Sequence, residues 1–92
     1  MQRMEFEWHD TKAASNLADH GVSFESAVAV FNDPQVLIVA TIRERDGEAR
    51  FKAIGLIQGR LYTVIHTMRG QIRRLISARP SNKAEERTYG NR

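Results

Sequence analysis

A cluster of side chains between positions 62 and 79 has the residue types that bind anions and transfer protons. Its members are one histidine, one tyrosine, one serine and four arginines: Tyr62, His66, Arg69, Arg73, Arg74, Ser77 and Arg79. Histidine titrates close to neutral pH, so it can give or take a proton during a reaction. Arginine holds phosphate through paired hydrogen bonds and stabilises charge that develops on it. Together these types suit cleavage of RNA without a metal ion.

Two interpretations of this cluster stay open at the level of residue types. In the first, the histidine and the arginines act on a phosphodiester bond. In the second, they form a solvated face of a sheet that only contacts a partner molecule, which is the more common role of such a cluster. The choice depends on which side chains share a face.

Two predicted strands, 61–68 and 71–78, must position the cluster, because both are rich in β-branched and apolar residues. Successive side chains of a strand point to opposite faces. Strict alternation along the second strand therefore predicts Arg73 and Arg79 on one face and Arg74 on the other.

The turn at Arg69-Gly70 sets the register of these two strands. A two-residue turn pairs His66 with Arg73, whereas a three-residue turn over 68–70 leaves Arg74 as its diagonal neighbour on the same face. Either register places a guanidinium near the imidazole on an open face of the sheet. The sequence leaves the choice between the two registers undecided.

The remaining segments surround this hairpin with strands and short helices. Strands are expected at 5–8, 36–42 and 50–57, a charged turn at 43–48, and helices at 11–20, 24–32 and 83–89. Asp10 and Ser23 are the expected N-caps of the first two helices, and Ser81 or Asn82 that of the last. The pattern predicts a single α+β domain over residues 1–92.

The net charge of +3 hides an uneven distribution. Residues 1–46 contain four Lys or Arg and eight Asp or Glu, a net charge of −4. Residues 47–92 contain ten Lys or Arg and three Glu, a net charge of +7. Such a split points to a polyanionic partner, most often nucleic acid. The alternative is an acidic half that folds against the basic half of the same chain.

Several classes of site are excluded by composition and spacing. The absence of cysteine excludes disulfides and thiolate metal sites. His9, His20 and His66 lack the spacing of a metal site, so we expect neither a metal nor another cofactor. The longest apolar runs, 36–40 and 61–65, are far too short to cross a membrane. We therefore expect a cytoplasmic protein without membrane contact.

Three residues outside the cluster are weaker candidates. Lys12 and His20 lie on about the same side of the first predicted helix, where they either contact phosphate or remain surface residues. Tyr89 in the last predicted helix either stacks on a base, donates a proton or anchors that helix to the sheet.

Sequence strings spread over nearly the whole chain resemble those of the BrnT toxins. In the first half they are Glu5-Phe6-Glu7-Trp8, Lys12, Asn16, His20-Gly21-Val22-Ser23-Phe24-Glu25, Ala27, Phe31 and Asp33-Pro34. In the second half they are Gly47-Glu48, Arg50-Phe51, Ile54-Gly55, His66-Thr67, Arg69-Gly70, Ile72, Arg74, Ile76-Ser77-Ala78-Arg79, Glu85 and Tyr89. The strings at 20–25 and 76–79 are fairly specific when they occur together.

The resemblance implies a fold, an activity and a partner. The fold would be RelE-like, an antiparallel sheet of about four to five strands with two N-terminal helices and a short C-terminal helix. The protein would be the toxin of a type II toxin–antitoxin system, an endoribonuclease that arrests translation. A BrnA-type ribbon-helix-helix antitoxin would neutralise it in a heterotetramer, and operator DNA would be contacted only through that antitoxin.

The resemblance and the residue cluster together give a hypothesis for the site. His66 transfers protons, while Arg74 and Arg79 hold the scissile phosphate. Further RNA contacts are predicted for Arg50, Arg69, Arg73, Lys12 and Tyr89. The alternative is a module that binds nucleic acid or an antitoxin without catalysis.

Overall fold

One mixed sheet with helices on both sides forms the protein, in a computed structural model that describes residues 5–41 and 48–91. The strands are β1 (Glu5–Glu7), β2 (Leu37–Ala40), β3 (Phe51–Ile57), β4 (Arg60–Arg69) and β5 (Ile72–Pro80). The helices are α1 (Asp10–His20), α2 (Phe24–Ala27), the 3-10 helix η1 (Val28–Asn32) and α3 (Lys83–Gly90). Of the charged turn predicted at 43–48, all but the last position lies outside the described residues. Among the described helices, none has the length and hydropathy of a membrane span.

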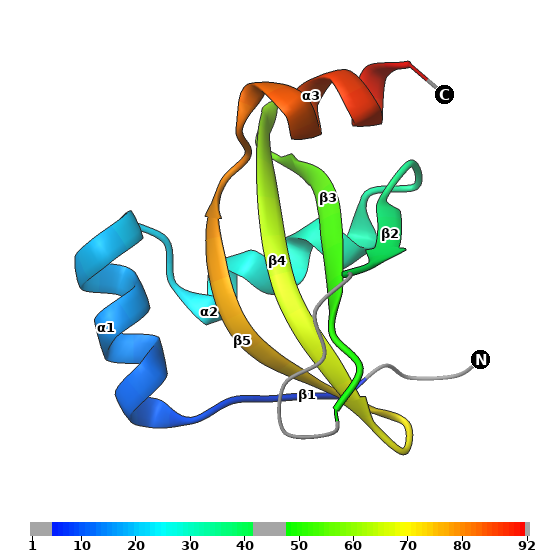
Figure 1. Ribbon diagram of the computed structural model, residues 1–92. Helices are drawn as coiled ribbons and strands as arrows, with labels where there is room; N and C mark the ends of the chain where they lie inside the picture. Colours follow the sequence, from blue (N-terminus) through cyan, green and yellow to red (C-terminus); the bar gives the residue numbers. More distant parts are fainter. Residues whose placement is uncertain (1–4, 42–47, 92) are drawn as a thin grey trace.

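The strands lie in the order β1-β5-β4-β3-β2 (Figure 1). The pairs β2–β3, β3–β4 and β4–β5 are antiparallel, as predicted. β1 is the exception, because it lies parallel to β5 with Glu5 opposite Ile72 and Glu7 opposite Arg74. The predicted α+β class, with two N-terminal helices and a short C-terminal one, is confirmed. The RelE-like label stays a prediction.

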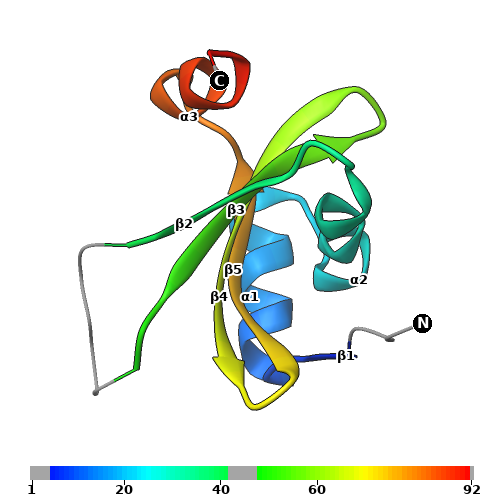
Figure 2. The ribbon, with the colours of Figure 1, turned by 90° about the vertical axis from the view of Figure 1, so that its right-hand side faces the viewer.

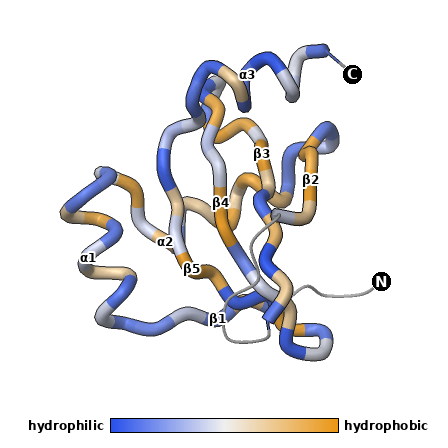
Figure 3. The backbone as a smooth tube through the Cα atoms, in the orientation of Figure 1, coloured by the Kyte–Doolittle hydropathy of each residue, from blue (hydrophilic) through white to orange (hydrophobic). Residues whose placement is uncertain are grey.

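The apolar core lies between the sheet and the segment α2–η1. Phe24, Val30, Val64 and Leu75 are each at most 1% exposed and belong to this core. In Figure 2, α1 and α2 lie on one side of the sheet, and α3 lies at its end on the other side. Figure 3 shows hydrophobic residues concentrated in the strands, whereas α3 is largely hydrophilic. The segment α2–η1 therefore covers one side of the sheet by apolar packing, whereas a largely hydrophilic helix lies at the end of the other side.

The helix starts follow capping chemistry. Ser23 caps α2 as predicted, since its Oγ accepts a hydrogen bond of 3.0 Å from the backbone N–H three residues later. Asn82 caps α3 and exchanges hydrogen bonds with Glu85 in a capping box. α1 begins at Asp10, so its N-cap is His9 and the predicted cap at Asp10 is wrong. Asp10 lies instead in the first turn, where the helix dipole favours a carboxylate.

The segment predicted as one helix over 24–32 consists of α2 followed by the tighter helix η1. η1 lies directly against β3 at Gly55. A Cβ atom at Gly55 would lie 2.8 Å from the Val30 carbonyl oxygen, closer than real Cβ atoms approach. Glycine at this position therefore permits the close packing of η1 on the sheet.

The side-chain amide of Asn16 closes the edge of β5 where β1 no longer covers it. Its Nδ2 donates to the Ala78 carbonyl at 2.8 Å, and its Oδ1 accepts from the Ala78 N–H at 2.9 Å. A neighbouring strand would make the same pair of hydrogen bonds. Nδ2 also donates to the Val22 carbonyl at 3.0 Å. Asn16 is 6% exposed, so these bonds fix α1 against the sheet in a place from which water is largely excluded.

Replacing Asn16 by leucine is expected to destabilise the protein, because the Ala78 backbone groups lose their partner while they stay buried. An unsatisfied buried polar group costs about 1–3 kcal/mol, so we expect the free energy of unfolding to fall by about 3 kcal/mol. Urea denaturation followed by circular dichroism measures this change. Ser15→Ala, an exposed change in the same helix, should leave stability within about 0.5 kcal/mol. An N16L variant as stable as the wild type would contradict the role of this amide.

Candidate functional site

The hairpin between β4 and β5 closes one residue later than predicted. Arg69 pairs with Ile72, so Gly70 and Gln71 form the turn. Gly70 has a φ of 61°, which glycine adopts without strain. Both predicted registers are therefore wrong, because each of them starts the turn before position 70.

A one-residue bulge in β5 then changes which side chains share a face. The register shifts between Ile65 and His66, which leaves Ile76 without a partner. Arg74 and Arg79 are five residues apart, and strict alternation would place them on opposite faces. Because the bulge adds one residue between them, both lie on the face opposite α2, which we call the open face.

His66 lies on the other face, inside the core. It is 1% exposed. Its ring stacks on Phe51 at 5.7 Å between centroids and meets Phe31 edge-on at 5.2 Å. The expectation of an imidazole on an open face is wrong, because Phe31 of η1 and Phe51 of β3 cover the face that carries His66. Proton transfer by His66 stays a prediction that the described geometry does not support.

Burial also sets the protonation of His66. Loss of hydration disfavours the imidazolium ion, and the positive charge of Arg73 disfavours it further, against an opposing hydrogen bond with the backbone of Val64. The pKa of His66 falls from 6.5 to about 4. The ring is therefore neutral at pH 7, and its Nδ1 atom is buried without a hydrogen-bond partner.

Arg73 lies on the same face as His66. Its guanidinium carbon is 4.2 Å from the centre of the Phe31 ring, a cation–π contact. Its Nε atom is buried and makes no hydrogen bond. The register therefore separates Arg73 from Arg74 and Arg79, the residues predicted to hold the scissile phosphate, and contact of Arg73 with RNA stays a prediction.

The carboxylate of Glu85 lies on the open face at the end of the sheet that α3 covers. Oε1 accepts hydrogen bonds from the Thr63 hydroxyl at 2.9 Å and from Arg79 at 2.7 Å. Oε2 accepts from the second Arg79 nitrogen at 2.8 Å and from Lys52 at 3.2 Å. The Asn82 N–H adds a donor to Oε1 at 2.9 Å. The Glu85 side chain is 2% exposed, whereas Lys52 and Arg79 are 33% and 31% exposed, so a buried carboxylate is held by partly exposed cations.

These contacts decide the charge of Glu85. Burial alone would raise the pKa of the carboxyl group. The hydrogen bonds from Arg79, the Asn82 N–H, Thr63 and Lys52 outweigh burial and lower the pKa of Glu85 from 4.5 to about 2. The same contact raises the pKa of the Arg79 guanidinium. Glu85 and Arg79 are therefore both charged at neutral pH.

Two other predicted site arginines also have carboxylate partners. Arg74 lies 2.6 Å from Glu7, with which it pairs across β1 and β5. Arg69 lies 3.6 Å from Glu48 near the β4–β5 turn. Glu7 and Arg74 come from the acidic and the basic half of the chain. Part of the charge asymmetry is therefore compensated within the protein.

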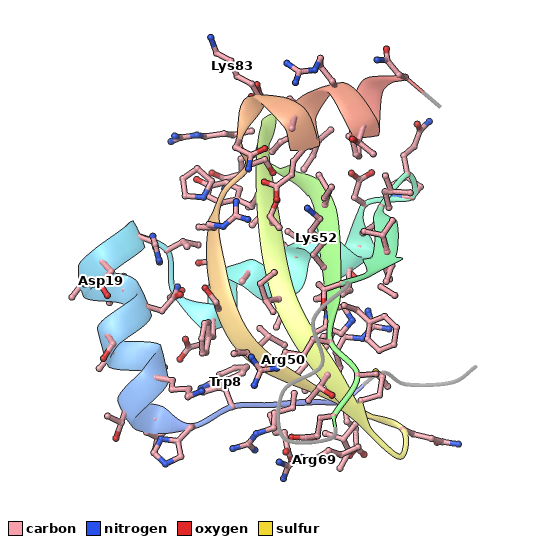
Figure 4. The ribbon with its side chains drawn as sticks, viewed as in Figure 1. Trp8, Asp19, Arg50, Lys52, Arg69 and Lys83 are labelled. Atoms are coloured by element: carbon pink, nitrogen blue, oxygen red, sulfur yellow. The ribbon has the colours of Figure 1, made fainter. Side chains whose placement is uncertain are left out.

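Arg50 and Lys52 add cations from the side of β3. Figure 4 shows both side chains in front of the sheet, with Lys52 below α3 and Arg50 nearer the β4–β5 turn. Lys52 and Glu85 are not among the predicted site residues. The capping-box spacing of Asn82 and Glu85 was a signal for a helix start, but nothing local shows that the same carboxylate reaches the sheet.

The remaining candidates lie at the margins of the sheet. Lys12 lines a shallow groove between α1 and β5 together with His20 and Ser77. The Tyr89 hydroxyl donates a hydrogen bond of 2.6 Å to Asp33, which agrees with its alternative role as an anchor of α3. Contact of Lys12 and Tyr89 with RNA stays a prediction.

The lowered pKa of His66 makes stability depend on pH in a defined window. Unfolded chains bind the imidazole proton near pH 6.5 and the folded protein only near pH 4, so stability is present above pH 6.5 and is lost as the pH falls toward 4. The loss is up to about 3 kcal/mol. Denaturation curves recorded between pH 7 and pH 4.5 measure it. His66→Phe should flatten this dependence, whereas the exposed change His20→Gln should keep it; equal slopes in all three proteins would contradict the assignment.

Comparison with known proteins names the family. A search of curated proteins finds no significant match. A family model described as the ribonuclease toxin BrnT of type II toxin–antitoxin systems matches residues 8–85, which is most of the chain. The match begins at Trp8, directly after β1, and ends at Glu85, the buried carboxylate of the open face. The chain therefore belongs to the BrnT family of ribonuclease toxins from type II toxin–antitoxin systems.

Proposed function

We propose that this toxin is an endoribonuclease that works without a metal ion and binds RNA across the open face of its sheet. The observation that carries the proposal is the group of cations on that face, from β5 and the β3 side: Arg74, Arg79, Arg50 and Lys52. Their positions along the strands suit successive phosphates of one RNA strand. Breakage of RNA bound there would arrest translation.

Cleavage joins the 2′-oxygen to phosphorus and breaks the bond from phosphorus to the 5′-oxygen. It needs a group that accepts the 2′-hydroxyl proton and positive charge near the phosphate, and in this proposal water gives the leaving 5′-oxygen its proton. Arg74 and Arg79 supply the charge for the additional negative charge of the transition state. Glu7 is 34% exposed and lies beside Arg74, so we assign it as the acceptor of the 2′-hydroxyl proton. His66 packs against Phe31 and Phe51 in the core and has no contact with RNA in this proposal.

The donor groups available support chemistry without a metal. Within residues 5–41 and 48–91, no group of three or more His, Asp and Glu side chains is arranged to hold a metal ion. In this proposal the guanidinium groups stabilise the charge that a metal ion would stabilise in other nucleases. We accordingly propose no cofactor.

A type II toxin has an antitoxin partner. We propose a BrnA-type ribbon-helix-helix antitoxin that forms a heterotetramer with the toxin and alone contacts operator DNA. An antitoxin that covers the open face would block RNA and use the same cations. We propose the cytoplasm as the place of action, since the RNA of translation is there.

RNA binding without cleavage is the second candidate function. The burial of His66 favours it, because this burial removes from the surface the side chain best suited to proton transfer at neutral pH. The two candidates differ in whether RNA is cut once it is bound.

Replacing Arg74 by alanine is expected to weaken RNA binding and cleavage. Arg74 is 27% exposed and its partner Glu7 is 34% exposed, so the fold should tolerate the loss. We expect about tenfold weaker binding of a single-stranded oligoribonucleotide and a salt dependence with about one fewer ion released. Cleavage should fall roughly 100-fold. Induced R74A should let cells grow where the wild-type toxin arrests them.

Arg60→Ala is the matched control, because it removes the same charge from an exposed position at the start of β4. It should remain toxic. Glu7→Gln separates the two candidate functions, since it should keep RNA binding and lose cleavage. A wild-type protein that binds RNA, never cuts it and leaves cellular RNA intact would exclude the nuclease and support the second candidate.

A further inference from the structure

The side chains that anchor α3 to the rest of the protein are polar. Of its eight residues only Glu85 is buried, Tyr89 is partly buried, and the others are exposed. The second anchor is the hydrogen bond of the Tyr89 hydroxyl to Asp33. The helix itself has no fully buried apolar side chain, and the apolar residue of the open face beside its anchor is Ile54, which pairs with Thr63 and is 1% exposed. The attachment therefore combines the cover of Ile54 with the charge of Glu85.

A groove between α3 and β2 shows that the helix does not seal against the sheet. Leu37 and Val39 line the groove from the strand, and Ala84 and Thr88 line it from the helix. α3 therefore meets the open face mainly through the Glu85 carboxylate.

The sheet offers this carboxylate the donors that a phosphate group uses. Both nitrogens of the Arg79 fork donate to it, at 2.7 and 2.8 Å. Thr63 adds a hydroxyl at 2.9 Å and Lys52 an ammonium at 3.2 Å. A bidentate guanidinium, a lysine and a hydroxyl are common partners of nucleic-acid phosphates. All three side chains belong to β3, β4 and β5, so they keep their positions when α3 moves.

We infer that Lys52, Thr63 and Arg79 form a phosphate site for RNA, which Glu85 fills in the free protein. RNA takes this site by replacing the carboxylate, and α3 then leaves the open face. The inference rests on the proposed function, because it assumes that RNA binds this face. The exchange replaces one anion by another over the same cations, so no buried charge loses its partner. α3 is in this view a cover that RNA displaces.

Glu85→Gln tests the exchange, because the two alternative roles of Glu85 predict opposite changes in the affinity for RNA. If the carboxylate competes with phosphate, E85Q should bind a fluorescent single-stranded oligoribonucleotide about tenfold more tightly than the wild type. If it only positions Arg79 and Lys52, the affinity of E85Q should fall. Glu86→Gln is the matched control, because it removes the same charge from an exposed position of the same helix turn. E86Q should change the affinity less than about twofold, and an E85Q affinity equal to that of E86Q, or lower, would overturn the inference.

A reversible cross-link tests the movement of α3 without changing the site. The chain has no cysteine, so Val39→Cys with Thr88→Cys introduces the only two thiols, one on each side of the groove. A bismaleimide with a reducible spacer then ties α3 to β2. We expect the linked protein to bind the oligoribonucleotide at least about tenfold more weakly, and to recover when the spacer is reduced. The single variant T88C, capped with a monofunctional maleimide, controls for bulk in the groove and should bind like the wild type.

The outcomes separate this inference from the proposed function. A linked protein that binds and cuts RNA as well as its reduced form would overturn the inference and leave the proposed function intact. A wild-type and reduced protein that neither bind nor cut RNA would overturn the proposed function, and the inference with it. Circular dichroism of each form shows that the comparison is between folded proteins.

Discussion

A single extra residue in β5 determines which of its side chains lie on each face of the sheet. Without the bulge at Ile76, alternation would place Arg74 and Arg79 on opposite sides. With it, both point away from the core, while Leu75 and Ala78 both point into it. The same register buries His66 between Phe31 and Phe51. A cationic face and a closed apolar core therefore depend on one local irregularity of the backbone.

That dependence explains which features could be predicted from the sequence. Strand and helix positions follow from local patterns, and Ser23 as a cap follows from side-chain chemistry. The turn at 70–71 and the bulge do not, because both satisfy pairings between strands that no short window contains. His66 shares a face with Arg73, as the two-residue turn predicted, but Phe31 and Phe51 cover that face, and the bulge moves Arg79 to the face of Arg74. The strand content of the prediction is right, whereas the exposure of His66 and the grouping of Arg79 with Arg73 are wrong for these reasons.

The open face is basic in composition but not bare. Arg79, Arg74 and Arg69 each lie against a carboxylate, from Glu85, Glu7 and Glu48 respectively. Free cations at such density would repel one another and destabilise the sheet. The carboxylates remove this repulsion in the free protein at positions where RNA phosphates would remove it in a complex. The acidic residues thus make a basic surface compatible with a stable fold, and any anionic partner must compete with them.

Glu48 and Glu85 differ in how strongly they would compete with an anionic partner for the arginines, and burial determines this difference. Glu48 and Arg69 are 38% and 53% exposed, so water and salt screen their attraction, and RNA bound as proposed would replace the contact at little cost. Glu85 is 2% exposed and has hydrogen bonds from three sheet side chains, so its replacement requires an anion that satisfies the same donors. A phosphate group can offer two oxygens to the Arg79 fork, as the carboxylate does, whereas chloride offers a single atom. In the proposed complex, the preference for phosphate over simple salt would then reside at the end of the sheet under α3, and the outer arginines would contribute attraction without selectivity.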